Sequence, residues 1–132
     1  MPRGFGMSSV KESLLRVHCG AFNAHDTALV ANTLLPSAPC WRDGTFIGEG
    51  ASGLRRAFEV EHASGEIFAQ VLEVEGEPMV VEWRGPEGRR EPLGVLRLQA
   101  QGDRVSEVRI EHDSETVRRL IERAAAYGPR LR

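Results

Sequence analysis

Two runs of alternating apolar and polar residues lie in the C-terminal third of the chain, and they limit its possible folds more than any other feature. The first run spans about residues 92–100 and the second about residues 104–112, with the polar turn Gln101-Gly102-Asp103 between them. Alternation with a period of two is typical of strands with one buried face, and a short turn containing glycine joins antiparallel strands. The chain is therefore expected to bury one face of a long hairpin.

Helical periodicity predicts three helices before the strands and one after them, at about residues 9–23, 26–35, 54–64 and 114–126. Further strands are expected near residues 66–75 and 78–84, and one or two short ones between 37 and 50. Helices followed by strands and a closing helix are typical of an α+β fold with a mostly antiparallel sheet. The buried face of the first helix is predicted to carry Val10, Leu14, Val17 and Ala21.

Length and charge indicate one ordinary globular domain, at residues 8–126, with flexible ends at 1–7 and 127–132. The 132 residues carry a formal net charge of −2, which predicts no binding to nucleic acid or to an anionic membrane. No apolar window approaches the length of a membrane span, and residues 1–9 lack the apolar core of a secretory signal. A cytoplasmic protein with reduced Cys19 and Cys40 is expected.

Turn lengths predict which side chains share a sheet face. A three-residue loop at 101–103 pairs Leu96 with Val108, and a four-residue loop at 85–88 joins the preceding hairpin. One apolar face toward the helices then carries Met79, Val81, Trp83, Gly94, Leu96, Leu98, Val108, Ile110 and His112. The opposite, half-charged face carries Val80, Glu82, Leu93, Val95, Arg97, Glu107, Arg109 and Glu111. Its mixture of apolar and charged residues predicts a two-fold homodimer interface, which light scattering would detect.

Three segments resemble the SnoaL-like polyketide cyclase branch of the nuclear transport factor 2-like superfamily. They are Ala21-Phe-Asn-Ala-His-Asp26, Trp41-Arg-Asp-Gly44 with the helix after Gly50, and residues 93–113. The resemblance covers about residues 10–125. It implies a cone of curved, mainly antiparallel sheet wrapped around the N-terminal helices, with a pocket at the open end. Members include cyclases, isomerases, epoxide hydrolases and proteins with no known reaction, so fold alone does not imply a reaction.

The predicted face of the last strand departs from the epoxide-hydrolase-like members at one position. Ile110 is expected to point into the cone between Val108 and His112, at the position where the resemblance would place an aspartate. An isoleucine cannot transfer a proton. The sequence therefore argues against epoxide hydrolysis and weakens the prediction of cyclase activity.

Three residues are the candidates for catalysis: His112, His62 and Asp43. Histidine serves as acid or base near neutral pH, although a buried histidine with one hydrogen bond is the more common case. Asp43 is followed by Gly44, which is equally consistent with a simple turn. Asp26 and Asp113 are interpreted as helix N-caps. Ligand binding is assigned to six apolar residues that are otherwise plain core positions: Trp41, Trp83, Met79, Leu96, Val108 and Ile110.

No metal or cofactor is predicted, because the histidines and cysteines lack metal-ligand spacing and no glycine-rich phosphate loop is present. Two functions stay open. The first is a module that binds a small apolar or aromatic molecule. The second is a cofactor-independent isomerase, cyclase or hydratase acting on a polyketide-, steroid- or terpene-like substrate. A buried, convergent ionisable pair would favour the enzyme, whereas a dry pocket would favour binding.

Overall fold

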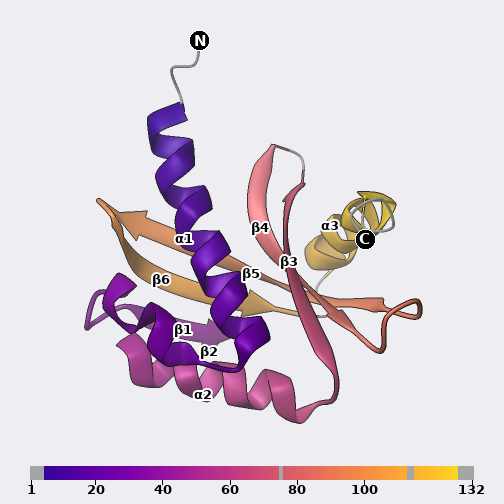
Figure 1. The fold of residues 1–132 in the computed structure, drawn as a ribbon, viewed down its shortest axis with the longest axis horizontal. Coiled ribbons are helices and arrows are strands. Elements are labelled where there is room, and N and C mark those ends of the chain that lie inside the picture. Colours follow the sequence, from indigo (N-terminus) through magenta and orange to yellow (C-terminus); the bar gives the residue numbers. More distant parts are fainter. Residues whose placement is uncertain (1–4, 75, 113–114, 128–132) are drawn as a thin grey trace.

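The computed structural model describes residues 5–74, 76–112 and 115–127 and contains one six-stranded sheet that curls around the N-terminal helices (Figure 1). The strands run in the order β2-β1-β6-β5-β4-β3, and only β1 and β6 pair in parallel. This arrangement confirms the predicted α+β class with a mixed sheet. The strands are β1 (Pro39–Arg42), β2 (Thr45–Glu49), β3 (Ile67–Val74), β4 (Glu77–Arg84), β5 (Glu91–Gln101) and β6 (Arg104–Glu111).

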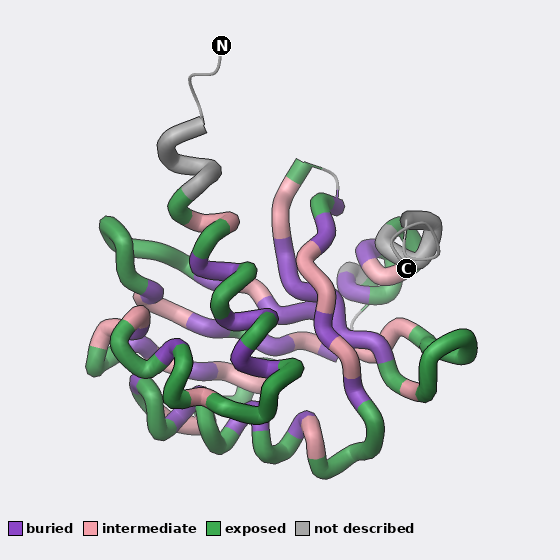
Figure 2. Tube along the Cα trace, in the orientation of Figure 1, coloured by how far each residue is buried: buried purple, intermediate pink, exposed green. Residues whose placement is uncertain are grey.

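Helices cover both sides of this sheet. They are α1 (Phe5–Ala24), the 3-10 helix η1 (Thr27–Thr33), α2 (Gly50–Ala63) and α3 (Glu115–Tyr127). Residues of α1, η1 and α2 form the main core with Leu96, Val108 and Ile110 of the sheet. A second core lies between α3 and the other side of β3, β4 and β5. The buried positions along the central strands in Figure 2 reflect this cover on two sides.

Helix α1 buries a different face from the predicted one. Leu14 and Ala21 are buried as expected, but Val10 and Val17 are 39% and 43% exposed. The buried stripe is centred instead on bulkier side chains, and Phe22 meets Phe58 of α2 edge-to-face with ring centroids 4.9 Å apart. The larger apolar area of such residues outweighs the regular spacing of the valines.

The predicted pairing of β5 with β6 is wrong by two residues. Leu96 pairs with Ile110 and Leu98 with Val108, because a two-residue turn is followed by a β-bulge at Gln99 and Ala100. A two-residue turn alone would place the apolar side chains of β5 and β6 on opposite faces of the sheet. The bulge returns them to the same face. Ile110 therefore still faces the main core, where it is fully buried, as predicted. Arg97 faces Arg109 rather than Glu107.

The predicted faces of β4 are exchanged. A bulge at Glu82 and Trp83 pairs Val80 with Leu96 and Glu82 with Gly94. Val80 and Glu82 therefore share the face of Leu96, contrary to the prediction, and the odd-numbered residues of β4 pack under α3. Because side chains alternate along a strand, a single inserted residue moves every following side chain to the other face.

This exchange and the cover by α3 together remove two of the apolar residues that motivated the predicted dimer face. Val80 is 1% exposed beneath the N-terminal helices, and Val95 is fully buried beneath α3. Leu93 is only partly buried, and Arg97 and Arg109 keep their outward, charged positions. The outer sheet face left open by α3 is thus more polar than the sequence predicts.

Two further predictions concern the termini and helix caps. Asp26 is the N-cap of η1, with its side chain accepting a hydrogen bond from the backbone N–H of Ala28, as predicted. Asp113 lies outside the described residues. Of the ends predicted to be flexible, only residues 5–7 and 127 are described, in α1 and α3. No described helix is both long enough and apolar enough to cross a membrane.

Candidate active site

A glycine on β5 makes room for the histidine that follows β6. Gly94 lies next to His112, and a Cβ atom at Gly94 would lie 2.8 Å from the His112 ring and 2.5 Å from the Glu111 carbonyl oxygen. Any other residue at this position would therefore collide with both. The close approach directs His112 toward Glu82, which is the β4 partner of Gly94.

Asp43 holds His112 at two points. Its carboxylate accepts a hydrogen bond of 2.7 Å from the His112 backbone N–H and lies 2.8 Å from the ring nitrogen Nδ1. Asp43 occupies the β1–β2 turn with a positive φ of 52°, and its own N–H donates to the Ile110 carbonyl oxygen. The turn is thus joined to the end of β6, and Asp43 holds a left-handed backbone conformation that few residues other than glycine adopt.

Glu61 approaches the same imidazole from α2. Its Oε1 lies 2.9 Å from His112 Nε2, and its Oε2 accepts a 2.5 Å charge-assisted hydrogen bond from Arg42 Nε. Glu61 is fully buried. Burial by itself would raise the pKa of this carboxyl group, but interactions with His112, Glu82 and Arg42 outweigh burial and lower the pKa to about 2. Glu61 is therefore an anion in the core.

The His112 imidazole is held between these two carboxylates. The hydrogen bond with Glu61 raises its pKa above the ordinary value, burial opposes this, and the hydrogen bond with Asp43 raises it further. The two carboxylates therefore stabilise the imidazolium form of His112 relative to that of a free histidine.

Glu82 is the most unusual member of the group. It is fully buried, and neither carboxylate oxygen has a hydrogen-bond partner. Its Oε1 lies 3.9 Å from His112 Nε2. Burial, and then the neighbouring Glu61 carboxylate, raise the pKa of Glu82 well above its ordinary value. We call Arg42, Asp43, Glu61, Glu82 and His112 the polar cluster.

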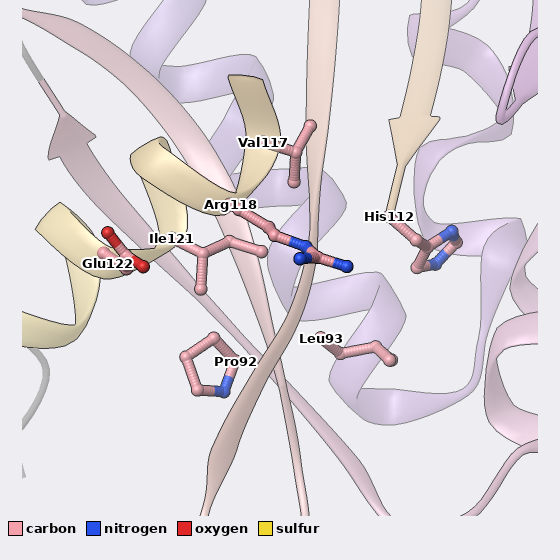
Figure 3. A pocket seen from close by; sticks show the side chains of 7 residues that line it. All are labelled: Pro92, Leu93, His112, Val117, Arg118, Ile121 and Glu122. Carbon is pink, nitrogen blue, oxygen red and sulfur yellow. The ribbon is translucent and has the colours of Figure 1, made fainter. Parts of the chain in front are cut away.

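A small cleft reaches the polar cluster at His112. Its volume is about 230 Å³. Figure 3 shows α3 on one side of it, and the Arg118 side chain extends from this helix toward His112. The lining is mainly apolar with two charged side chains, and it consists of Pro92, Leu93, His112, Val117, Arg118, Ile121 and Glu122.

The structure brings two of the three candidate catalytic residues together and places the third elsewhere. His112 and Asp43 are in contact, whereas the His62 ring stacks on His25 with centroids 3.7 Å apart. Burial, followed by the nearby His25, lowers the pKa of His62. This stack contains no member of the polar cluster, so His62 is not part of the site around His112.

The six residues assigned to ligand binding do not line this cleft. Leu96, Val108 and Ile110 are at most 1% exposed in the main core, which they fill together with the helices. Met79 and Trp83 belong to the second core beneath α3. Trp41 packs edge-to-face on Phe46 and under the Arg109 guanidinium.

Sequence reasoning missed Arg42, Glu61 and Glu82. Glu61 did carry a signal, because it lies on the apolar stripe of α2, where an ionised side chain needs a partner. Regular alternation along β4 places Glu82 on the outer face, whereas the bulge beside it turns the side chain inward. Within the described chain, Glu61, Glu82 and His112 form a group of potential metal ligands, with one ligand atom from each lying within 4.8 Å of the others.

Replacing Gly94 with alanine is expected to destabilise the fold by about 1–3 kcal/mol and to move the His112 ring away from Glu61. The added methyl group has no free space between Glu111 and His112. Urea unfolding measures the first effect, and the NMR signals of the His112 ring measure the second. Gly20→Ala is the control, because that helical position has open space around it and alanine favours a helix. An unchanged His112 signal in Gly94→Ala would contradict the argument.

Neither a protein-family model nor a curated protein matches the sequence. Solved structures do match. An NTF2-like protein of unknown function from Burkholderia pseudomallei is 19% identical, with a TM-score of 0.58, over 85% of this chain and 97% of that one. A candidate polyketide cyclase from Sinorhizobium meliloti is 17% identical, with a TM-score of 0.57, over 74% and 93%. TerC, crystallised with polyporic acid, is 12% identical, with a TM-score of 0.59, over 86% and 98%. The chain therefore has the nuclear transport factor 2-like fold that its sequence predicts.

Proposed function

We propose that this protein is an enzyme that acts on a small, mainly apolar molecule bound in the cleft beside His112. One observation carries the proposal: His112 borders the cleft while its ring is held between the carboxylates of Asp43 and Glu61. Convergent ionisable groups with perturbed pKa values beside a cleft are typical of active sites.

The size and the lining of the cleft favour a small substrate. Its volume of about 230 Å³ is below the ~300–1,000 Å³ of pockets that take drug-sized ligands. Pro92, Leu93, Val117 and Ile121 supply apolar walls. TerC, which shares the fold, was crystallised with polyporic acid, and this is consistent with a cyclic organic ligand here.

The polar cluster supports a reaction that moves a proton next to a polarised oxygen. The positive centre at His112 would attract a carbonyl or hydroxyl oxygen of the substrate, and Asp43, whose side chain is 47% exposed, would accept a proton from carbon or water. The isomerase, cyclase and hydratase classes all use this combination of an electrophile and a base. The likeness to a candidate polyketide cyclase is consistent with these classes.

A binding module without turnover is the second candidate. It is favoured by the fact that both ring nitrogens of His112 already contact protein carboxylates, so a substrate must displace one of these contacts to reach the ring. Homodimer formation through the outer sheet face, and a cytoplasmic location, stay predictions of the sequence.

The test follows proton exchange rather than one chosen reaction. Small cyclic ketones and phenols are screened for binding by NMR, and bound ketones are incubated in D₂O to detect deuterium next to the carbonyl group. We expect exchange in the wild type and a loss of about 10²–10⁴-fold in Asp43→Asn. Glu73→Gln, an exposed carboxylate on β3, is the control and should match the wild type.

Ligand affinity separates the two candidates. If Asp43→Asn and His112→Gln keep the ligand affinity but lose exchange, the enzyme proposal is supported. If ligands bind the wild type and no exchange or conversion follows, the protein is a binding module.

A further inference from the structure

The neighbours of the buried Glu82 carboxyl group are two ionisable side chains, Glu61 and His112. Glu82 is 0% exposed, and neither oxygen makes a hydrogen bond. Buried polar groups are nearly always hydrogen-bonded, so an orphan of this kind needs a physical explanation. The Glu82 side chain is directed toward the ring of His112, with 3.9 Å between Oε1 and Nε2.

The Glu82 carboxyl group is one of three side chains whose potential ligand atoms converge. Glu61 Oε1 lies 2.9 Å from His112 Nε2, and one ligand atom from each of Glu61, Glu82 and His112 lies within 4.8 Å of the others. Two ligand atoms that share a metal ion at about 2.1 Å lie roughly 3–3.5 Å apart. Movements of about 1 Å in side chains would therefore bring all three atoms to one ion.

The surroundings orient the ligands as in known metal sites. Asp43 contacts His112 Nδ1, which leaves Nε2 as the nitrogen directed at both glutamates. A carboxylate on the outer nitrogen of a metal-binding histidine is a common supporting contact, since it fixes ring orientation and tautomer. Arg42 holds Glu61 through Oε2 and so leaves Oε1 directed toward the ligand set.

The charges in the polar cluster also suit a divalent cation. Asp43, Glu61 and Glu82 supply three carboxylates, and Arg42 is the one guanidinium that contacts them in the described cluster. With a neutral imidazole and an ionised Glu82, the states that metal ligation requires, the group carries two negative charges. A divalent ion would balance them, whereas an uncompensated buried charge is costly.

We propose that Glu61, Glu82 and His112 bind one divalent transition-metal ion of the Zn²⁺, Mn²⁺ or Fe²⁺ class. One imidazole and two carboxylates suit these ions, whereas thiolate-seeking ions would prefer sulfur ligands. The cleft borders one of the three ligands, His112, and an ion would have to enter from that side because Glu61 and Glu82 are fully buried. That the ion serves as the electrophile of the reaction rests on the proposed function, whereas the binding itself does not.

Binding requires two local changes. The hydrogen bond between His112 Nε2 and Glu61 Oε1 opens, and any proton on Nε2 or on Glu82 is released to solvent as the ion enters. Glu61 keeps Arg42, and His112 keeps Asp43. The fold therefore need not rearrange, because both supporting contacts lie on the far side of the ligand atoms.

The test titrates Zn²⁺, and separately Mn²⁺, into the full-length protein after dialysis against a chelator, with isothermal titration calorimetry as the readout. We expect one ion per chain. Glu82→Gln, which preserves shape, should weaken binding by at least about 100-fold. Asp43→Asn should weaken it by about 10–100-fold, because Asp43 supports a ligand without touching the ion. Glu73→Gln on β3 should bind as the wild type does.

Cobalt spectra and folding controls complete the experiment. Co²⁺ should give visible absorption bands in the wild type and lose them in both Glu82→Gln and His112→Gln, with circular dichroism showing that the variants are folded. The site would be overturned if the wild type bound no stoichiometric ion. It would also be overturned if Glu82→Gln and His112→Gln bound the ion as tightly as the wild type does. If deuterium exchange persists after chelation, the ion is not the electrophile, and the proposed function stands without it.

Discussion

Replacing Glu61 with alanine is expected to lower the free energy of unfolding by about 3–5 kcal/mol, the usual effect of removing one partner of a buried ion pair. Glu61 is fully buried and contacts both Arg42 and His112. Its loss leaves the Arg42 guanidinium and the Nε2 atom of His112 without the carboxylate that they share, and it opens a cavity at the end of α2. Urea unfolding followed by circular dichroism measures the change.

The matched control is Glu12→Ala. Glu12 also pairs with an arginine, Arg16, but both side chains are largely exposed on α1. An exposed pair at this spacing is worth about 0.3–0.5 kcal/mol, so the control should be close to the wild type. If Glu61→Ala and Glu12→Ala had similar stabilities, Glu61 would not be the central anion of the polar cluster.

Acidification is expected to destabilise the protein through His18, by about 3 kcal/mol between pH 6.5 and pH 4. Burial lowers the pKa of His18 from 6.5 to about 4, and the residue is 1% exposed. The unfolded chain therefore binds a proton in this window and the folded chain does not. The contribution of His18 is complete above pH 6.5 and is lost as the pH falls toward 4.

Hydrogen bonding around His18 explains why the folded protein rejects the proton. The Thr33 hydroxyl donates to the Val30 carbonyl oxygen at 2.7 Å, so it accepts from His18 Nε2 at 3.1 Å. The other nitrogen, Nδ1, has no partner and would have to carry the added proton. A charged donor without an acceptor in the core is strongly unfavourable.

The measurement compares urea unfolding at pH 7 and pH 4.5 for the wild type and His18→Leu. Other groups titrate in the same range, so the difference between the two proteins isolates His18. The variant should lose less stability on acidification. An NMR titration of the His18 ring with a midpoint near 6.5 would contradict the prediction.

Several elements of this protein follow from local sequence. Alternation between residues 92 and 112 predicts two long strands and the inward direction of Ile110, and both are found. The helices after Asp26 and after Gly50 are also found close to their predicted ranges. These predictions succeed because a period of two or of 3.6 residues reports directly which side chains one segment can bury.

The faces of β4 and the composition of the site do not follow from such periods. A single bulge between Glu82 and Trp83 decides that Glu82 turns inward toward His112, and another bulge moves Gly94 from Ile110 to His112. The position of a bulge depends on how the whole sheet packs against its helices. It therefore cannot be predicted from the sequence of one strand.

The sequence alone therefore determined the class of fold and its elements, and it named His112, His62 and Asp43 as candidates without deciding which histidine meets Asp43. Tertiary structure alone decided that His112 and Asp43 form a pair that meets Glu61 and Glu82, which lie 51 and 30 residues before His112 on α2 and β4. Local periodicity describes one element at a time, whereas a buried ionic cluster arises from distances between side chains of different elements. Those distances are set only when the curled sheet closes on α2.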